Sequence, residues 1–364
     1  MTSGLYMLSL SVGLLMICMF FYSIKYRGKF KLSINDITIV LFYVTVNLSS
    51  ILFLNGSDGL KVSLYFVSIL YMIIVGTFLS MFYRMDKTYI IKTFKIALII
   101  YGGSIIFQNI VYFLSKEYID FFKYFSFGNS ESRYLSKTFQ EFGLIRSTSF
   151  FSEPSNASAV VSMLAFCYMI ITNKIDKYVI FGLFSSMLTL SSAGVLIGAI
   201  TLVLIILFDS GYFKSKTLKY ITAIFVICSL YYILALTVER IFNNNEYDML
   251  LSRSTILYMI SDMNTINHIF GNGIKILSSP LSLYNYTVHD YTIRDSGFIL
   301  NLYFSVGIIG MVIFLLFIKK QIKRKLFIVI LFVLLQSKFD YLQPVFWMVI
   351  FTISKDIKNL SKHC

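Results

Sequence analysis

Uninterrupted runs of apolar residues are the sequence feature that most limits the possible folds. Leu5 to Ile24 is the first of them, and similar runs recur along the 364-residue chain. A run of about 20 such residues is long enough to cross the hydrocarbon core of a bilayer as a helix. Hydrophobic residues make up 57% of the chain and charged residues 14%, whereas soluble domains carry about 25% charged residues. Too few polar side chains remain to cover a water-soluble globule, so we expect an all-α polytopic membrane protein.

The same length criterion predicts about eleven transmembrane helices in a single integral membrane domain, 1–364. The first run lacks a preceding basic segment and a small-residue cleavage site, so we interpret it as a span rather than a signal peptide. The predicted spans are 5–24, 36–54, 62–83, 91–113, 154–172, 178–191, 193–208, 219–238, 296–318, 326–339 and 341–354. The pairs 178–191/193–208 and 326–339/341–354 are short, and each fits a tight hairpin, a re-entrant pair or one long tilted span.

The positions of the charged residues give the predicted spans an orientation. On this topology 21 of the 32 Lys and Arg residues lie in cytoplasmic segments, whereas 13 of the 18 Asp and Glu residues lie in external ones. This asymmetry follows the positive-inside rule, and it places the N-terminus outside and the C-terminus inside. The net charge of +14 therefore reflects topology and gives no indication of nucleic-acid binding.

Two external segments, 114–153 and 239–295, are much longer than a simple turn. Loops longer than about 12–15 residues are usually functional or disordered, and both segments carry aromatic residues. We therefore expect two partly structured external loops that carry the chemistry on the extracytoplasmic face. The sequence shows no internal repeat of the kind that marks many secondary transporters.

The first polar cluster runs from Arg146 to Ala157 and leads directly into an apolar helix. Its sequence is Arg-Ser-Thr-Ser-Phe-Phe-Ser-Glu-Pro-Ser-Asn-Ala. Proline is favoured in the first turn of a helix, and Ser or Glu just before it can cap the free amides. Two interpretations remain open. One is an anion-binding helix N-terminus to which Arg146 adds a guanidinium, and the other is an ordinary capped helix with Arg146 at the headgroup level.

Two further clusters lie in the second external loop. Arg253 opens an apolar-periodic stretch that ends at 271–273 (Gly-Asn-Gly), which predicts one helix. Two interpretations stay open, an amphipathic helix along the membrane surface and a helix that Arg253 simply caps or solvates. His289, Arg294 and Asp295 fall within seven residues ahead of an apolar span. Asp295 or His289 suits a general base for a sugar hydroxyl, and Arg294 suits a pyrophosphate. The alternative for each of these residues is an ordinary surface charge or helix cap.

Motifs for other kinds of chemistry are missing from the sequence. Its four cysteines are scattered, its three histidines form no metal-binding set, and it has no Walker P-loop, GxSxG or GxGxxG. We therefore predict neither a metal nor a cofactor. Gly102-Gly103 and 191–194 (Ser-Ser-Ala-Gly) indicate close helix packing or a tight turn. Gln108 and Asn109, polar within a predicted span, indicate hydrogen bonds between helices.

Three elements of the sequence carry a family resemblance. The cluster 146–157 resembles the R-x-x-G-x-F-x-E-P-N box of the O-antigen polymerase and ligase superfamily, with Ser149 at the position of its glycine. The stretch 253–273 is similar to the loop element of that superfamily. The stretch 295–298 (Asp-Ser-Gly-Phe), followed by 307–310 (Gly-Ile-Ile-Gly), resembles its next element, which ends in G-x-x-G. The resemblance covers most of the chain in the same order, and the Glu-Pro box is its most specific motif.

The resemblance implies a GT-C-like integral membrane glycosyltransferase of the bacterial cytoplasmic (inner) membrane. It implies a Wzy-type polymerase of O-antigen or of capsular or exopolysaccharide, which acts on undecaprenyl-pyrophosphate-linked oligosaccharide. Its partners would be a chain-length regulator and a flippase, and it would need no metal. By resemblance, three arginines would neutralise the departing pyrophosphate: Arg146, Arg253 and Arg294. Three residues are candidates for the base that activates the acceptor hydroxyl: Asp295, Glu153 and His289.

Two other functions stay open at this point. An O-antigen ligase would transfer the finished glycan to a different acceptor, but the Asp295-Ser296 pair stands where ligases tend to carry His-Asn, which favours a polymerase. A transporter or flippase of lipid-linked oligosaccharide would need polar or charged groups at the bilayer midplane. The notable charges here lie in external loops or at the ends of spans, which favours chemistry at the surface.

Overall fold

The computed structural model describes part of the chain. The described residues are 87–126, 130–135, 139, 143–208, 249–273, 281–283, 286–288, 296–336 and 344–354, with scattered residues between 220 and 235. The predicted spans 5–24, 36–54 and 62–83 lie outside them. The chain divides into two compact units, of which unit 2 comprises 86–248 and 324–338 and unit 1 comprises the remainder.

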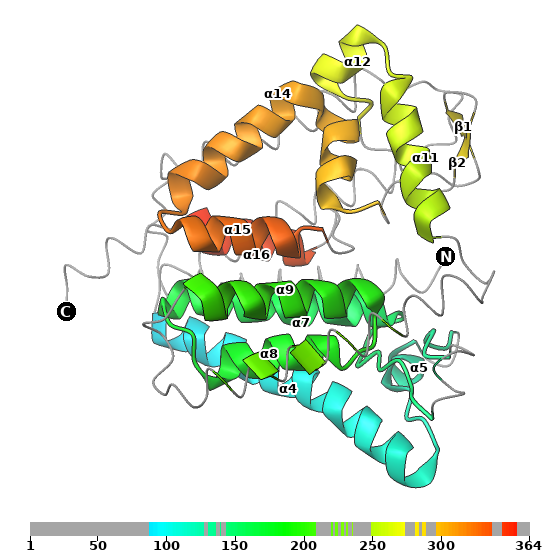
Figure 1. Ribbon diagram of the computed structural model, residues 1–364, viewed down its shortest axis with the longest axis vertical. Coiled ribbons are helices and arrows are strands. Elements are labelled where there is room, and N and C mark those ends of the chain that lie inside the picture. Colours follow the sequence, from blue (N-terminus) through cyan, green and yellow to red (C-terminus); the bar gives the residue numbers. More distant parts are fainter. Residues whose placement is uncertain are drawn as a thin grey trace, which may run out of the picture. The chain divides into compact units, whose positions relative to one another are not determined.

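Unit 2 is a helical bundle built around one central helix. Its helices are α4 (Lys87–Ser115), α5 (Phe121–Phe125), α7 (Pro154–Thr172), α8 (Lys177–Met187), α9 (Ser192–Phe208) and α15 (Lys325–Leu334). The helix α7 packs against α4, α8, α9 and α15, and Figure 1 shows α8 and α9 running alongside it. Almost every residue of α7 after its first turn is buried. The N-terminus of α7, where the first polar cluster lies, is therefore fixed by its neighbours.

Small residues allow these helices to approach closely, as the sequence predicts. A Cβ added at Gly182 of α8 would lie 2.9 Å from Cβ of Ala165 on α7, and one at Gly102 of α4 would lie 2.7 Å from the ring of Phe181 on α8. Gly194 of α9 meets Ser158 of α7 in the same way. These contacts confirm helix packing as the role of Gly102 and Gly194, whereas a Cβ at Gly103 would meet nothing within 4 Å.

Three helices are long and apolar enough to cross a membrane: Ile90–Ser115, Pro154–Thr172 and Phe298–Gln321. The outward faces of the first and third of these helices carry large apolar side chains that a bilayer would cover. On α4 these are Ile96, Ile99, Ile100, Phe107 and Ile110, and on the third helix they are Ile308, Ile309, Val312, Leu315 and Leu316. The chain is therefore a helical, multi-pass membrane protein, as the sequence predicts.

The short predicted pair 178–191/193–208 forms two separate helices. The turn 188–191 joins α8 to α9, and the two helices pack against each other. This hairpin excludes the alternative of one long tilted span. The 11 residues of α8 reach about 16 Å, well short of the ~30 Å hydrocarbon core. The helix α8 therefore does not cross a bilayer by itself.

Unit 1 contains the helices α11 (Met249–Ser261), α12 (Thr265–Phe270), α14 (Phe298–Gln321) and α16 (Pro344–Ser354) and one hairpin, β1 (Leu281–Leu283) with β2 (Tyr286–Val288). The prediction of a single helix from Arg253 to the glycines is wrong, because the structure has two helices there. The stretch breaks into α11 and α12, because the side chain of Asn264 caps the second helix by accepting from the N–H of Asn267. The apolar face of α11 is covered by α14. Ile256, Met259 and Met263 pack with Phe304 of α14 in a small buried core.

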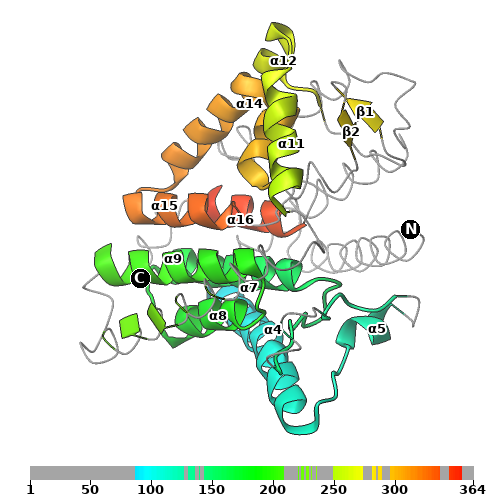
Figure 2. The ribbon, with the colours of Figure 1, turned by 45° about the vertical axis from the view of Figure 1, so that its right-hand side comes forward.

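The two glycine motifs of the sequence meet in this unit. The helix α14 bends at Gly307 (φ 61°, ψ −163°), and Figures 1 and 2 show its two arms. The chain after α12 lies at the bend, where the N–H of Asn272 donates to the carbonyl of Phe304 at 2.8 Å and that of Gly273 donates to Ser305 at 2.9 Å. A Cβ at Gly307 would lie 2.5 Å from the carbonyl oxygen of Ile269. Backbone approaches backbone here, so only glycine fits.

We predict that Gly307→Ala destabilises the protein, because it combines a strained φ with overlap against the backbone of Ile269. Residues forced into such conformations cost on the order of 1–3 kcal/mol. The matched control is Gly103→Ala, since a Cβ at Gly103 of α4 meets nothing within 4 Å. Thermal unfolding of the purified protein in detergent should show a lower Tm for Gly307→Ala alone. Equal Tm values for the two variants would contradict the close approach.

Candidate functional site

The first polar cluster begins the central helix of unit 2. Glu153 is the N-cap residue of α7 in extended conformation, with Pro154 in the first turn. The carbonyl of Glu153 accepts from the N–H groups of Asn156 and Ala157, both at 3.2 Å. The proline-led helix start is confirmed, but the Glu153 side chain does not cap it. Its carboxylate is therefore available for contacts outside the helix.

The carboxylate of Glu153 binds an arginine that the sequence did not indicate. Arg133 Nη1 donates to Glu153 Oε1 at 2.8 Å, and Ser155 Oγ lies 3.3 Å from Oε2. The Glu153 side chain is 20% exposed and the Arg133 side chain 80% exposed. Arg133 stands 20 residues earlier in a loop with several charges, so no spacing in the sequence marks it as a partner. The pair places the Arg133 guanidinium against the carboxylate at the start of α7.

The segment 144–153 is held rigidly against α4. Ser147, Thr148 and Ser149 are fully buried. Gln108 of α4, also fully buried, accepts from the N–H of Ser149 at 2.8 Å and donates to the carbonyl of Ile119 at 2.9 Å. Its Nε2 also lies 3.4 Å from the carbonyl of Ser149. The prediction of hydrogen bonds between helices is therefore wrong for Gln108, because its partners lie in a loop.

Ser149 adopts a left-handed conformation, with φ at 52°. Non-glycine residues are uncommon there, and the conformation must be supported by surrounding contacts. The support comes from Gln108 and from Ser104, whose Oγ lies 2.5 Å from Oγ of Ser149. The next two residues are Phe150 and Phe151, and Tyr101 of α4 contacts both rings, Phe150 edge-on and Phe151 at a tilt.

Arg146 lies on the same held segment. Its backbone N–H donates to the carbonyl of Tyr134 at 3.4 Å, and its Nε atom is buried. The N–H of Arg133 donates to the carbonyl of Ser152 at 2.7 Å. The strip 131–135 thus runs beside the cluster from Arg146 to Glu153. Both predicted site residues of this cluster are therefore brought to one place at the start of α7.

A pocket of about 640 Å³ adjoins this segment, at the end of α4 and around α5. Its wall includes Tyr118 and Tyr134, whose rings are stacked with centroids 3.9 Å apart and 16° between their planes. The hydroxyl of Tyr118 lies 2.7 Å from Oγ1 of Thr148 and accepts from the Thr148 N–H at 3.3 Å. Burial raises the pKa of Tyr118 and also that of Tyr134. Both phenols therefore stay protonated throughout the physiological range.

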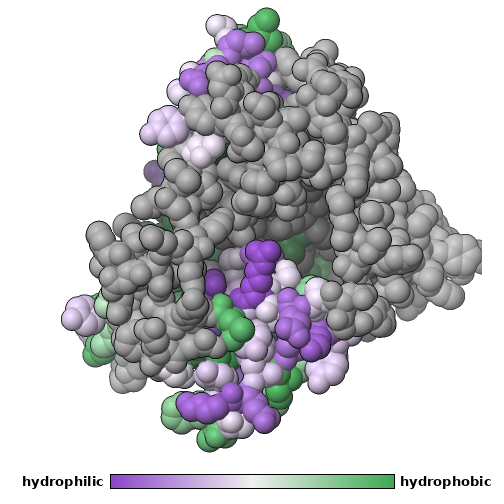
Figure 3. Space-filling model, turned by 90° about the vertical axis from the view of Figure 1, so that its right-hand side faces the viewer, coloured by the Kyte–Doolittle hydropathy of each residue, from purple (hydrophilic) through white to green (hydrophobic). Residues whose placement is uncertain are grey.

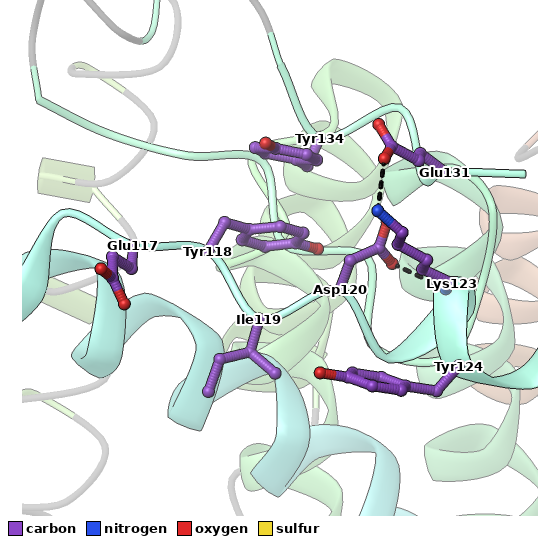
Figure 4. Close-up of a pocket in the computed structure, with 8 residues that line it drawn as sticks. All are labelled: Glu117, Tyr118, Ile119, Asp120, Lys123, Tyr124, Glu131 and Tyr134. Atoms are coloured by element: carbon purple, nitrogen blue, oxygen red, sulfur yellow. Dashed lines mark hydrogen bonds and ion pairs between the residues drawn. The ribbon is translucent and has the colours of Figure 1, made fainter. Parts of the chain in front are cut away.

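Charged side chains line the rest of the pocket. Figure 4 shows Asp120, Lys123 and Glu131 on one side of the stacked rings and Glu117 on the other. Lys123 Nζ lies 2.7 Å from Glu131 Oε1, and this hydrogen bond raises the pKa of Lys123 and lowers that of Glu131. The pair is therefore ionised at neutral pH. It is lost only as the pH falls through the lowered pKa or rises through the raised one.

Hydrophilic residues gather on one part of the face seen in Figure 3, below its centre. The loop residues around the pocket are mostly exposed, whereas α7 behind them is buried. In unit 2 the polar loop around the pocket thus adjoins the apolar helices of the bundle. Such a boundary between apolar and polar surface is typical of a helix bundle that emerges from a membrane.

The second and third clusters are described less fully. Arg253 lies within α11, but its side chain is outside the described residues, as are His289, Arg294 and Asp295. The glycines that follow Arg253 in the loop element contact the Gly307 bend, so those two elements of the sequence are neighbours in unit 1. Within the described part of the chain, no group of three or more His, Cys, Asp or Glu residues is placed to hold a metal ion.

No protein-family model, no curated protein and no solved structure matches the chain. The superfamily resemblance therefore remains a prediction that rests on the short motifs of the sequence.

We predict that Gln108→Leu loosens the segment 144–153. The buried N–H of Ser149 would lose its acceptor, which costs about 1–3 kcal/mol. Limited proteolysis should cut the loop 114–153 faster than in the wild type, and the Tm in detergent should fall. The control is Gln321→Leu, because the buried Nε2 of Gln321 has no hydrogen-bond partner among the described residues. Unchanged proteolysis in Gln108→Leu would show that this amide does not hold the loop.

Proposed function

We propose that the protein is a glycosyltransferase that polymerises polyprenyl-pyrophosphate-linked oligosaccharide repeats at the outer face of the bacterial cytoplasmic membrane. The observation that carries the proposal is the placement of Arg146 and Glu153 on one buried, hydrogen-bonded segment at the start of a membrane helix. A polymerase of this kind needs a cation and a carboxylate fixed at the membrane surface. The topology that belongs to the proposal is the one with both long loops outside.

The proposed reaction joins two lipid-linked saccharides. A hydroxyl of the acceptor sugar attacks the anomeric carbon of the donor sugar, and the bond from that carbon to the diphosphate oxygen breaks. The hydroxyl proton passes to a carboxylate or imidazole, and the polyprenyl diphosphate leaves with the electron pair. Negative charge develops on the leaving oxygen, so fixed cationic donors stabilise the transition state most where water is excluded.

The roles of the residues follow from this reaction. Arg146, with Arg253 and Arg294, would neutralise the departing diphosphate, since a guanidinium binds phosphate oxygens in a bidentate manner. Glu153, Asp295 and His289 remain the candidates for the base. Glu153 is the candidate whose carboxylate the structure describes, and it lies 2.8 Å from Nη1 of Arg133.

The composition of the membrane helices supports surface chemistry over transport. The helices α7 and α9 contain no Asp, Glu, Lys or Arg residue. A transporter of a charged substrate would place such groups near the bilayer midplane. The charged residues of unit 2 lie instead in the loop before α7 and towards the ends of its helices, where a lipid-linked diphosphate would sit with its headgroup.

We predict that Arg146→Ala lowers elongation by at least about 100-fold, because removal of one fixed donor to a developing oxyanion costs on the order of 10²–10³ in rate. The assay follows elongation of a polyprenyl-diphosphate-linked repeat by the purified protein in liposomes without an ion gradient. Arg324→Ala is the control, since Arg324 lies at the start of α15 near the ring of Phe327. Wild-type product ladders from Arg146→Ala would refute the assignment. Movement of substrate that depends on an ion gradient, without elongation, would indicate a transporter.

We also predict that reporter fusions within 114–153 and within 239–295 report an extracytoplasmic location. The physical reason is the excess of Lys and Arg in the segments that alternate with these loops. A fusion after Lys216, in a segment predicted to be cytoplasmic, provides the opposite signal. A cytoplasmic signal from the loop 114–153 would place Arg146 on the wrong side of the membrane for this reaction.

A further inference from the structure

The pocket beside the Arg146–Glu153 segment has the wrong charge for a diphosphate. Glu117, Asp120 and Glu131 oppose the single ammonium of Lys123, which leaves two net negative charges in the wall. Like charges at such distances repel, and a loop at the membrane surface screens them only in part. The leaving group of the proposed reaction therefore binds elsewhere, and this pocket suits a different part of the substrate.

The rings of the pocket suit the face of a sugar. The C–H bonds on one face of a pyranose carry partial positive charge and lie well over the negative face of an aromatic ring. Tyr118 and Tyr134 form a stacked pair, and Tyr124, at 75% exposure, presents its ring to solvent within the same wall. An isoprenoid tail would also cover exposed rings, but it would leave the carboxylates beside it without water or partners.

The carboxylates of the pocket are acceptors for hydroxyl groups. Asp120 is fixed, because its Oδ1 accepts from the N–H of Lys123 at 3.2 Å and its Oδ2 accepts from the N–H of Ser132 at 2.7 Å. Each oxygen of a carboxylate has a further lone pair for a ligand. The carboxylate of Glu117 is exposed and has no partner among the described residues. Hydroxyl groups, which donate and accept, match this wall better than any anion does.

We propose that this pocket binds a sugar ring that carries no acidic group. It would hold part of the saccharide substrate of the reaction proposed above, on which this inference rests. The cavity of about 640 Å³ falls within the ~300–1,000 Å³ typical of small-molecule sites. Three bonds connect it to the candidate site. Tyr118 bonds to Thr148, the carbonyl of Tyr134 accepts from the N–H of Arg146, and the carbonyl of Ile119 accepts from Gln108. A bound sugar would thus lie beside the segment that carries Arg146 and Glu153.

Saturation-transfer NMR on the full-length protein in nanodiscs tests this proposal. The probes are methyl glucoside, methyl glucosaminide and methyl glucuronide, which are neutral, cationic and anionic versions of one ring. We expect saturation transfer to the ring C–H protons of the first two and little to the third. Tyr124→Leu should reduce the signal several-fold by removing the exposed ring. Glu117→Gln should reduce the glucosaminide signal and increase the glucuronide signal.

The controls are matched in chemistry and exposure. Tyr258→Leu removes a tyrosine that is 57% exposed outside the pocket, and Asp262→Asn removes an exposed carboxylate, both on the other unit. Both should retain the wild-type signals. All four positions are exposed, so none of the substitutions disturbs buried packing.

Three results would overturn the proposal. They are signals no greater than those of empty nanodiscs, equal signals in wild type and Tyr124→Leu, and a strongest signal from the glucuronide. The readout is binding and needs no elongation. If the pocket binds the neutral ring while the wild-type protein fails to elongate lipid-linked repeats, the sugar-binding proposal is supported and the polymerase function is refuted. If the protein elongates lipid-linked repeats but the pocket binds no sugar, the pocket proposal is refuted and the polymerase function is supported.

Discussion

A buried amide inside a membrane helix must find hydrogen-bond partners, because neither lipid nor an apolar core supplies them. Gln108 finds them in the backbone of Ile119 and Ser149. One side chain thereby ties both ends of the first external loop to α4. The stacked tyrosines, the left-handed Ser149 and the start of α7 all depend on this attachment, since each lies on the loop that Gln108 holds.

In unit 1, backbone groups alone satisfy the hydrogen-bonding groups that are freed at a bend in a helix. The helix α14 bends at Gly307, and the free carbonyls at the bend accept from the N–H groups of Asn272 and Gly273. Membrane helices tolerate such breaks only where neighbouring groups satisfy the freed backbone. The small core of Ile256, Met259 and Phe304 then fixes α11 on α14. Arg253 is carried on a helix whose position is set by these contacts.

The sequence predicts the features that depend on local pattern. The span 154–172 was predicted with the bounds of α7, because an apolar run and a leading Pro154 define both its length and its start. Contacts between distant residues leave no such pattern. Arg133 pairs with Glu153 across 20 residues, and Tyr118 stacks on Tyr134 across a loop, so neither was identified. The break at Asn264 was missed because the apolar period continues across it. The glycine motifs were found, but their contact with each other depends on the fold of unit 1.

The acidic pocket and Arg146 carry charges of opposite sign, and this difference bears on how a substrate would be oriented. Arg146 donates its backbone N–H to the carbonyl of Tyr134, so the guanidinium and the acidic pocket belong to adjoining parts of one loop. A lipid-linked saccharide has a diphosphate at one end of its sugar chain and hydroxyl groups along the rest. In the proposed reaction the carboxylates of the pocket would repel the diphosphate end while Arg146 would attract it, so only one orientation would satisfy both. Repulsion of the wrong arrangement contributes to specificity as much as attraction of the right one. An acidic pocket in the same loop as Arg146 is therefore consistent with the single substrate proposed here, because it would determine which end of that substrate reaches Arg146.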